Sequence, residues 1–200
     1  MKRIFLLVLM FVIAPVAFGD GDAAAGKKLT AVCAACHGPD GNSPSDAFPN
    51  LAGQNTRYLA KQLTEIKSGM RAVPTMTGQL DAMSLQDFED IAAYYASLAK
   101  AQGVAATDQV ELGESIYRVG ISRKNIAACS ACHSPTGSGN NPAGFPALSG
   151  QWPAYTISQL KAFQAGSRHN DGDGKMMQDT AEDMNEKEMS AVAAYIYGLR

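Results

Sequence analysis

The sequence has no excess of charge of one sign. Its 200 residues contain 17 Lys and Arg against 19 Asp and Glu, so the formal net charge is −2. Proteins that bind nucleic acid mainly through phosphate contacts carry a basic face, and the composition argues against that class. Hydrophobic residues make up 46% of the chain and charged residues 18%, which argues against wholesale disorder.

Long hydrophobic runs are absent after residue 19. Two basic residues precede an apolar stretch over residues 4–18, and the small residues Ala17 and Gly19 stand at positions −3 and −1 of a cut after residue 19. This pattern is typical of a secretory signal peptide, and the stretch is shorter than the roughly 20 apolar residues of a membrane-spanning helix. We therefore expect residues 1–19 to be removed and the mature chain to be exported to the periplasm. An uncleaved anchor is the alternative.

Alternating runs that would indicate β-strands are also lacking, and helical spacing takes their place. Residues 55–68 carry their apolar side chains at helical intervals, and Gly69 follows where a left-handed C-terminal cap is expected. A second such helix is predicted from Pro153 to residue 165, ending before Gly166. The pattern predicts an all-α fold.

The two halves also share the start of their last helix. Ser84 is followed three residues later by Asp87, and Asn185 by Glu188, the spacing of a capping box. The first helices are expected at residues 23–35 and 108–119, and the small, polar residues 99–107 are expected to form a linker.

The sequence contains an internal repeat, so that its two halves share the same motifs in the same order. Cys33-Ala-Ala-Cys36-His37 recurs 96 residues later as Cys129-Ser-Ala-Cys132-His133, and Phe-Pro-x-Leu-x-Gly-Gln occurs at 48–54 and at 145–151. Further pairs follow in the same order: Tyr58/Tyr155, Gln62/Gln159, Arg71/Arg168, Met76/Met177 and Met83/Met184. A period near 97 residues suits two tandem small domains, which we place at residues 20–104 and 105–200.

All four cysteines lie inside the two Cys-x-x-Cys-His motifs. In an exported protein this motif indicates c-type haem attachment, because two thiols three residues apart can reach the two vinyl groups on one porphyrin edge. The adjacent His then offers a nitrogen to the iron. We predict two covalently bound haem c groups, attached at Cys33, Cys36, Cys129 and Cys132, with His37 and His133 as axial ligands of the iron. The haems are expected to complete the cores of two helical bundles too small to bury much surface alone.

Three other uses of these cysteines fit the sequence less well. Disulfides within Cys-x-x-Cys would close short, strained loops. A zinc site of four cysteines would require the two motifs to meet and would leave the following His unexplained. A thioredoxin-like redox pair belongs with a βαβ pattern, which the sequence lacks.

The second axial ligand is predicted to be methionine. His169 is the only other histidine and lies in a loop without a counterpart in the first half, whereas His/Met ligation is an established electron-transfer arrangement. Two methionine pairs recur in register, Met76/Met177 and Met83/Met184, and the repeat alone does not choose between them.

Helix capping separates the two pairs. Met83 and Met184 immediately precede the caps, and an apolar residue follows five positions later, at Phe88 and Met189. That is the spacing of a hydrophobic staple, so a structural role accounts for this pair. Met76 and Met177, expected in loops, remain as the predicted iron ligands, with Met176 as the alternative to its neighbour.

On these residues the chain resembles the dihaem cytochrome c4 family, whose members consist of two tandem class I cytochrome c domains. The resemblance covers the mature chain and rests on the segment at 33–42, the two Phe-Pro-x-Leu-x-Gly-Gln segments, Thr75-Met76-Thr77-Gly78 and the segment at 170–173. It implies the ligand pairs His37/Met76 and His133/Met177.

The resemblance also implies a function. The chain would be a periplasmic electron carrier rather than an enzyme, taking electrons from a quinol-oxidising complex to a terminal oxidase, with loose membrane association left open. Alternatives are a haem-bearing subunit of a dehydrogenase, for example one oxidising sulfide or an alcohol, and a dihaem peroxidase, which would need one displaceable axial ligand.

Further roles follow from the family fold. The carbonyls of Pro49 and Pro146 are the positional candidates to accept a hydrogen bond from the axial histidines. Arg71 and Arg168 either pair with haem propionates or are exposed to solvent at the end of a helix. Five further residues either line the haem propionates or the domain interface, or serve only in packing and turns. They are Gln54, Tyr58, Gln151, Trp152 and Tyr155.

Overall fold

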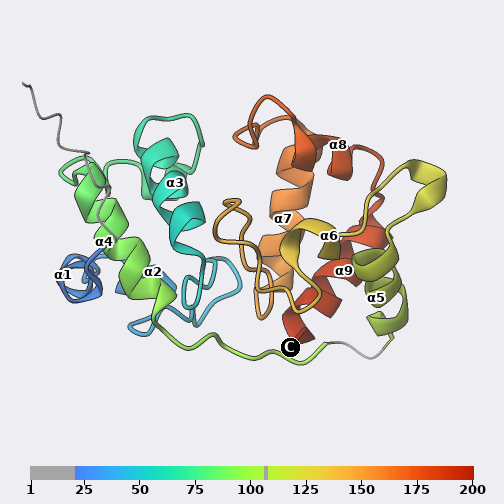
Figure 1. The fold of residues 1–200 in the computed structure, drawn as a ribbon, viewed down its shortest axis with the longest axis horizontal. Coiled ribbons are helices and arrows are strands. Elements are labelled where there is room, and N and C mark those ends of the chain that lie inside the picture. The colour runs from blue at the N-terminus through green and yellow to red at the C-terminus, as the bar shows by residue number, and fades with distance from the viewer. Residues whose placement is uncertain (1–20, 106–107) are drawn as a thin grey trace, which may run out of the picture.

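A computed structural model describes residues 21–105 and 108–200, so the expected signal peptide lies outside the described residues. Two groups of helices lie side by side, one from each half of the sequence (Figure 1). Within the described ranges the extended structure is limited to two isolated bridges, Ile121–Ile126 and Asn140–Phe145. The all-α prediction is confirmed. No described helix has the length and apolar character needed to cross a membrane.

The first half is built on the crossing of its first and last long helices. Its elements are α1 (Ala23–Leu29), α2 (Ala34–His37), α3 (Thr56–Lys67), the 3-10 turn η1 (Pro74–Met76) and α4 (Leu85–Ala96). A Cβ atom on Gly26 of α1 would lie 2.0 Å from the carbonyl oxygen of Asp90 in α4, so the two backbones touch. Phe88, Ile91 and Tyr95 of α4 are buried in the core beneath α3.

The first helix of this half is shorter than predicted. Helix α1 ends at Leu29 rather than near residue 35, because Thr30 bonds back to Lys27 with both its N–H and its hydroxyl. Such local bonds of Thr compete with continuation of a helix. The chain then turns and starts the separate helix α2, which holds most of the first Cys-x-x-Cys-His motif.

The second half repeats this plan. Its elements are α5 (Val110–Val119), the 3-10 turn η2 (Ser122–Lys124), α6 (Ser130–His133), α7 (Pro153–Gln164), α8 (Met176–Glu182) and α9 (Glu186–Gly198). Helix α5 crosses α9 as α1 crosses α4, and a Cβ on Gly113 would lie 2.2 Å from the carbonyl oxygen of Ala191. Ile116 and Tyr117 of α5 and Met189 and Val192 of α9 fill the core.

The predicted helix ends are confirmed. The side chains of Ser84 and Asn185 accept from the N–H of Asp87 and Glu188, and both capping boxes are complete. Pro153 opens α7, and Gly69 and Gly166 follow α3 and α7 with φ of +79° and +68°.

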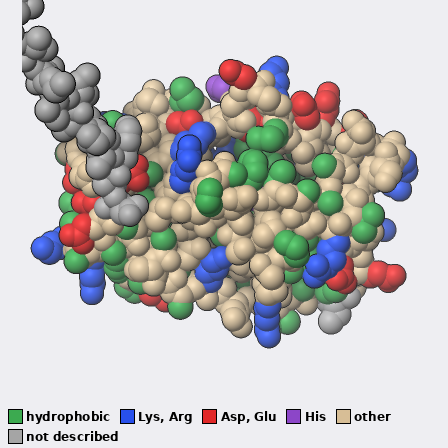
Figure 2. All heavy atoms as spheres, in the orientation of Figure 1, with side chains coloured by type: hydrophobic (Ala, Val, Ile, Leu, Met, Phe, Trp, Pro, Cys, Tyr) green, Lys and Arg blue, Asp and Glu red, His purple; other side chains and the backbone are tan. Residues whose placement is uncertain are grey.

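The segment after α4 packs against both halves. The N–H of Ala101 donates to Asn42 Oδ1 at 2.7 Å, and Gly103 lies against the ring of Tyr197. That ring stacks on Trp152 with centroids 5.0 Å apart, and the Trp152 indole N–H donates to the carbonyl oxygen of Ser43 at 3.2 Å. On the face shown in Figure 2, basic and acidic side chains are interspersed.

Candidate functional site

The first Cys-x-x-Cys-His motif forms a single helical turn. The N–H groups of Cys36 and His37 both donate to the carbonyl oxygen of Cys33, at 3.2 and 3.0 Å, which brings the two thiols and the imidazole to one side. His37 Nδ1 lies 2.9 Å from the carbonyl oxygen of Pro49. Because a carbonyl can only accept, Nδ1 carries the proton and Nε2 keeps a lone pair for a metal.

The second motif has the same geometry. His133 lies at the end of α6, and its Nδ1 is 3.0 Å from the carbonyl oxygen of Pro146. Burial lowers the pKa of His37 and of His133, although each proline carbonyl acts in the opposite direction. Both imidazoles are therefore neutral at pH 7. The predicted contacts of Pro49 and Pro146 with the two histidines are confirmed.

None of the four cysteines forms a disulfide, and all are partly buried. Burial raises the pKa of the Cys33 thiol, and it raises the pKa of the Cys129 thiol to about 11. Within residues 21–105 and 108–200, no three His, Cys, Asp or Glu side chains gather to hold a metal ion. The disulfide and four-cysteine zinc alternatives therefore have no counterpart in the described structure.

Both predicted methionine ligands line the same cavity as the histidines. Met76 ends η1 and is partly buried. Met177 is the second residue of α8, so the expectation of a loop is wrong there: Asp171 Oδ2 accepts from the N–H groups of Met177 and Gln178, both at 2.9 Å, and this starts a helix. Met176 also reaches the cavity but is 49% exposed, whereas Met177 is partly buried.

The other methionine pair lies where the staple predicts. Met184 and Met189 are both buried and belong to the core of the second half. Met83 packs against the core cluster that contains Phe88. His169 is exposed and does not line the cavity.

One continuous cavity of about 1160 Å³ joins the two halves. It exceeds the roughly 300–1,000 Å³ of a pocket for one small molecule. Its lining is mainly apolar and includes all eight predicted site residues: Cys33, Cys36, His37, Met76, Cys129, Cys132, His133 and Met177.

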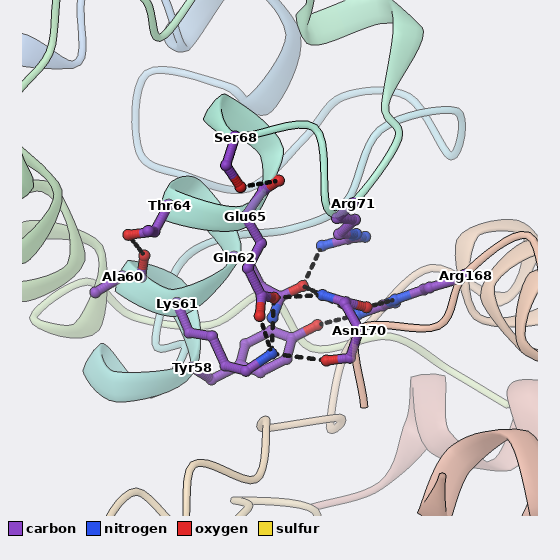
Figure 3. Close-up of polar contacts among 10 residues, drawn as sticks. All are labelled: Tyr58, Ala60, Lys61, Gln62, Thr64, Glu65, Ser68, Arg71, Arg168 and Asn170. Atoms are coloured by element: carbon purple, nitrogen blue, oxygen red, sulfur yellow. Dashed lines mark hydrogen bonds and ion pairs between the residues drawn. The ribbon is translucent and has the colours of Figure 1, made fainter. Parts of the chain in front are cut away.

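Arg71 and Arg168 lie between the halves, and part of their network is drawn in Figure 3. Arg71 donates to Gln62 at 2.8 Å and, across the interface, to Tyr155 Oη and Gln159, both at 3.0 Å. Arg168 mirrors this. It donates to Gln159 at 2.7 Å and, across the interface, to Tyr58 Oη at 3.0 Å and Gln62 at 3.1 Å.

These contacts decide part of what the sequence leaves open. Both arginines are buried, 9% and 8% exposed, so the alternative of solvated helix ends is wrong. Gln54, Tyr58, Gln151, Trp152 and Tyr155 all make contacts across the interface. Gln62 and Gln159 belong to the same network, and their recurrence in register was the signal for it. Asn50 also bonds across the interface, but the sequence offers no sign of this because two of its three bonds there are made by its backbone.

The two guanidinium groups have neutral partners. Among the described residues, neither forms an ion pair with a carboxylate. Burial would raise the pKa of Tyr58, but Arg168 and Arg71 hold it below its ordinary value, which reflects the surplus positive charge. A buried cation without an anion costs several kcal/mol (roughly 3–5 when a partner is removed), so the cavity is suited to a ligand with acidic groups.

The residues present therefore fit two haem c groups. Each half offers two thiols, a neutral imidazole with Nε2 free and a thioether around an apolar space, and the shared arginines can meet propionates.

Comparison with known proteins agrees with this geometry. The family model for cytochrome c matches residues 23–99 and 120–200. Cytochrome c4 of Pseudomonas aeruginosa is 48% identical over 198 residues, covering 99% of this chain and 98% of the relative. A crystal structure of reduced recombinant cytochrome c4 from Pseudomonas stutzeri superposes with a TM-score of 0.88 at 48% identity, covering 90% of this chain and 100% of that chain.

The chain belongs to the cytochrome c4 family. As a member it carries two covalently bound haem c groups and is an electron-transfer protein. A more distant relative, a thiosulfate dehydrogenase electron acceptor of Stutzerimonas stutzeri, is 38% identical over 168 residues, covering 82% of this chain and 76% of the relative.

Proposed function

We propose that the chain is a periplasmic electron carrier with one haem c in each of two domains, residues 20–104 and 105–200, after removal of a signal peptide at residues 1–19. The haems are attached at Cys33 and Cys36 and at Cys129 and Cys132. The axial pairs are His37/Met76 and His133/Met177. The observation that carries the proposal is that both complete sets of side chains line one continuous cavity.

Haem iron supplies reversible one-electron chemistry when bound. Residues of the chain would set the basicity of the iron ligands and the reduction potential. The carbonyl oxygens of Pro49 and Pro146 fix the imidazole orientation and raise the basicity of Nε2. Met76 and Met177 would be the second protein ligands of the two irons, and methionine ligation favours a high reduction potential. With a histidine and a methionine both supplied by the protein, oxygen and peroxide would find no open site, which favours carriage over the peroxidase alternative.

The proposed donor is a quinol-oxidising complex and the proposed acceptor a terminal oxidase. The continuity of the cavity across the interface supports passage of electrons between the halves. Similarity to the thiosulfate dehydrogenase electron acceptor favours a second candidate, in which a dehydrogenase is the donor. Stable co-purification with a dehydrogenase would select that candidate, whereas reduction by a quinol-oxidising complex followed by oxidation by a terminal oxidase would select the first.

An optical redox titration of the mature protein, combined with its intact mass, tests the core of the proposal. We expect the mass of two haems on the polypeptide and two one-electron steps. In the ferric protein we expect the weak methionine-to-iron absorption band from both haems. The mass of bare polypeptide after proper maturation would contradict the proposal.

Methionine variants test the ligands. Met76→Leu and Met177→Leu should each remove about half of the methionine-to-iron band. Met176→Leu is the matched control next to Met177 and should retain the full band. Loss of half of the band in Met176→Leu with retention in Met177→Leu would move the ligand by one residue.

A further inference from the structure

The loop that leads to Met177 is four residues longer than its counterpart in the first half. Nine positions separate Arg168 from Met177, but only five separate Arg71 from Met76. The extra residues include Asn170, which is 5% exposed although it lies in a loop. Its position against α3 of the first half is shown in Figure 3.

Asn170 bonds to three residues of α3. Its side-chain Nδ2 donates to Gln62 Oε1 at 2.9 Å and to Glu65 Oε2 at 2.6 Å, and its carbonyl oxygen accepts from Lys61 Nζ at 2.7 Å. Lys61 and Glu65 are themselves an ion pair at 2.6 Å. Asn170 Oδ1 accepts from Arg168 Nε at 3.0 Å. The buried side-chain amide of Asn170 thus uses both of its hydrogens and its oxygen in hydrogen bonds, and its two Nδ2 bonds hold the loop against the other half.

The next residue, Asp171, holds the start of α8. Its Oδ2 accepts from the N–H groups of Met177 and Gln178, and its Oδ1 accepts from Gln178 Nε2 at 2.8 Å. Asn170 and Asp171 share a peptide bond, so their Cα atoms stay about 3.8 Å apart. A shift of Asn170 away from α3 must displace the carboxylate that positions Met177.

The first half lacks this connection. The N–H of Met76 donates to the carbonyl oxygen of Val73 within its own loop, at 2.9 Å. Arg71, five residues before Met76, does bond to the second half. Across the described ranges, however, no hydrogen bond joins residues 72–79 to that half, and no side chain of the N-cap residue caps the turn that ends at Met76. The two methionines are therefore held differently although they are repeat partners.

We infer that Asn170 is a positioning residue that makes iron ligation by Met177 depend on docking of the first half more strongly than ligation by Met76 depends on docking of the second half. The inference rests on the proposed ligand role of Met177. The two haems then respond differently when the contact of Asn170 with α3 is broken, and the second haem loses its methionine first.

Asn170→Ala in the full-length holoprotein tests the inference. We expect the ferric protein to keep two haems while the methionine-to-iron band falls toward half. We also expect imidazole to bind one of the two haems faster, by roughly fivefold or more, because the variant loses three side-chain hydrogen bonds and each is worth about a fivefold change. Lys61→Met removes the bond to the Asn170 carbonyl together with the ion pair between Lys61 and Glu65, and it leaves the Asn170 side chain in place. It should give a smaller change at the same haem and serves if Asn170→Ala does not fold.

Asn55→Ala is the matched control. Asn55 Nδ2 also donates across the interface, to the carbonyl oxygens of Ser138 and Phe145 at 3.2 and 2.7 Å, but on a segment that does not lead to Met177. It should leave the band and the imidazole rates unchanged. Equal effects of Asn55→Ala and Asn170→Ala, equal effects on both haems, or no effect of Asn170→Ala would overturn the inference.

Failure of the proposed ligand assignment can be distinguished from failure of the positioning role of Asn170. If Met177→Leu keeps the whole band, Met177 is not the ligand and the proposed ligand assignment is wrong. If Met177→Leu removes half of the band while Asn170→Ala changes nothing, only the positioning role is wrong. In a Met177→Leu background, Asn170→Ala should have no further effect on the band.

Discussion

Gln54 and Ala147 exchange two hydrogen bonds across the interface between the halves. Gln54 Nε2 donates to the carbonyl oxygen of Ala147 at 3.0 Å, and Gln54 Oε1 accepts from the Ala147 N–H at 2.8 Å. Their repeat partners do the same in the opposite direction. Gln151 Nε2 donates to the carbonyl oxygen of Asn50, and Gln151 Oε1 accepts from its N–H, both at 2.9 Å.

Gln54→Ala should lower the free energy of unfolding by about 2 kcal/mol, because the buried N–H and carbonyl of Ala147 lose their partners. Gln151→Ala should have an effect of similar size, since its contacts are equivalent. Urea denaturation of the ferric protein measures both. Gln102→Ala, at an exposed position, is the control and should change stability by less than about 0.5 kcal/mol. Unequal single-variant effects would contradict the equivalence of the two contacts.

Arg71→Met should lower the reduction potential of at least one haem by on the order of 50 mV, because a nearby cation stabilises the reduced, less positive iron. Arg168→Met should have the same sign. Arg118→Met removes an exposed cation that pairs with Glu114 and should leave both potentials within about 10 mV, since exposed charges are screened. An optical redox titration measures the three variants, and a rise in potential for Arg71→Met would refute the surplus positive charge inferred for the cavity.

Gly113→Ala should destabilise the second half by about 3 kcal/mol or more. The added methyl would lie 2.2 Å from the Ala191 carbonyl oxygen and 2.7 Å from the Tyr195 Cβ, and a core cannot absorb such an overlap without shifting α5 from α9. Ser115→Ala, at an exposed position of the same helix, should be neutral or slightly stabilising. Thermal unfolding followed by circular dichroism distinguishes the two, and a stable Gly113→Ala protein would show that the helices can separate freely.

Glu188→Gln should reduce stability by about 2 kcal/mol at pH 7 and by much less in acid. The Glu188 carboxylate is 4% exposed. It accepts from Lys124 at 2.7 Å and from the N–H of Asn185 at 2.9 Å. Burial acts to raise its pKa, but Lys124 and the Asn185 N–H lower it below its ordinary value.

The sign of the pH dependence follows from that lowered pKa. A carboxyl group with a lower pKa in the folded protein contributes stability above its unfolded pKa of about 4.3, and this contribution is lost as the pH falls through the folded value. The difference between wild type and Glu188→Gln, measured by urea denaturation from pH 7 to pH 3, should shrink over the acid end of that range. The exposed Glu182→Gln provides the comparison, and a difference that grows in acid would exclude a stabilising carboxylate.

Much of this architecture follows from local patterns in the sequence. The capping boxes at Ser84 and Asn185 fix where the last helices start, because their bonds involve residues three apart. Pro153 and Gly166 bound α7 for similarly local reasons. The motif spacing also predicts which histidines and cysteines meet, since they belong to one helical turn.

The remaining features depend on distant residues and could not be read from local spacing. Met177 lies in a helix because Asp171 caps it from six residues away. The burial of Arg71 and Arg168 depends on partners 84 to 110 positions distant. Their matched positions in the repeat indicated a shared role but could not distinguish an interface from a solvated helix end.

The mirrored contacts of Arg71 and Arg168 give the interface the form of an isologous contact, in which one patch meets a copy of itself. That is the geometry of a twofold homodimer. Here the two copies belong to one polypeptide, and the short connection after residue 98 keeps them at an effective concentration in the millimolar range or above. Assembly of the two-haem unit is consequently independent of protein dilution, as it would not be for two separate single-haem chains.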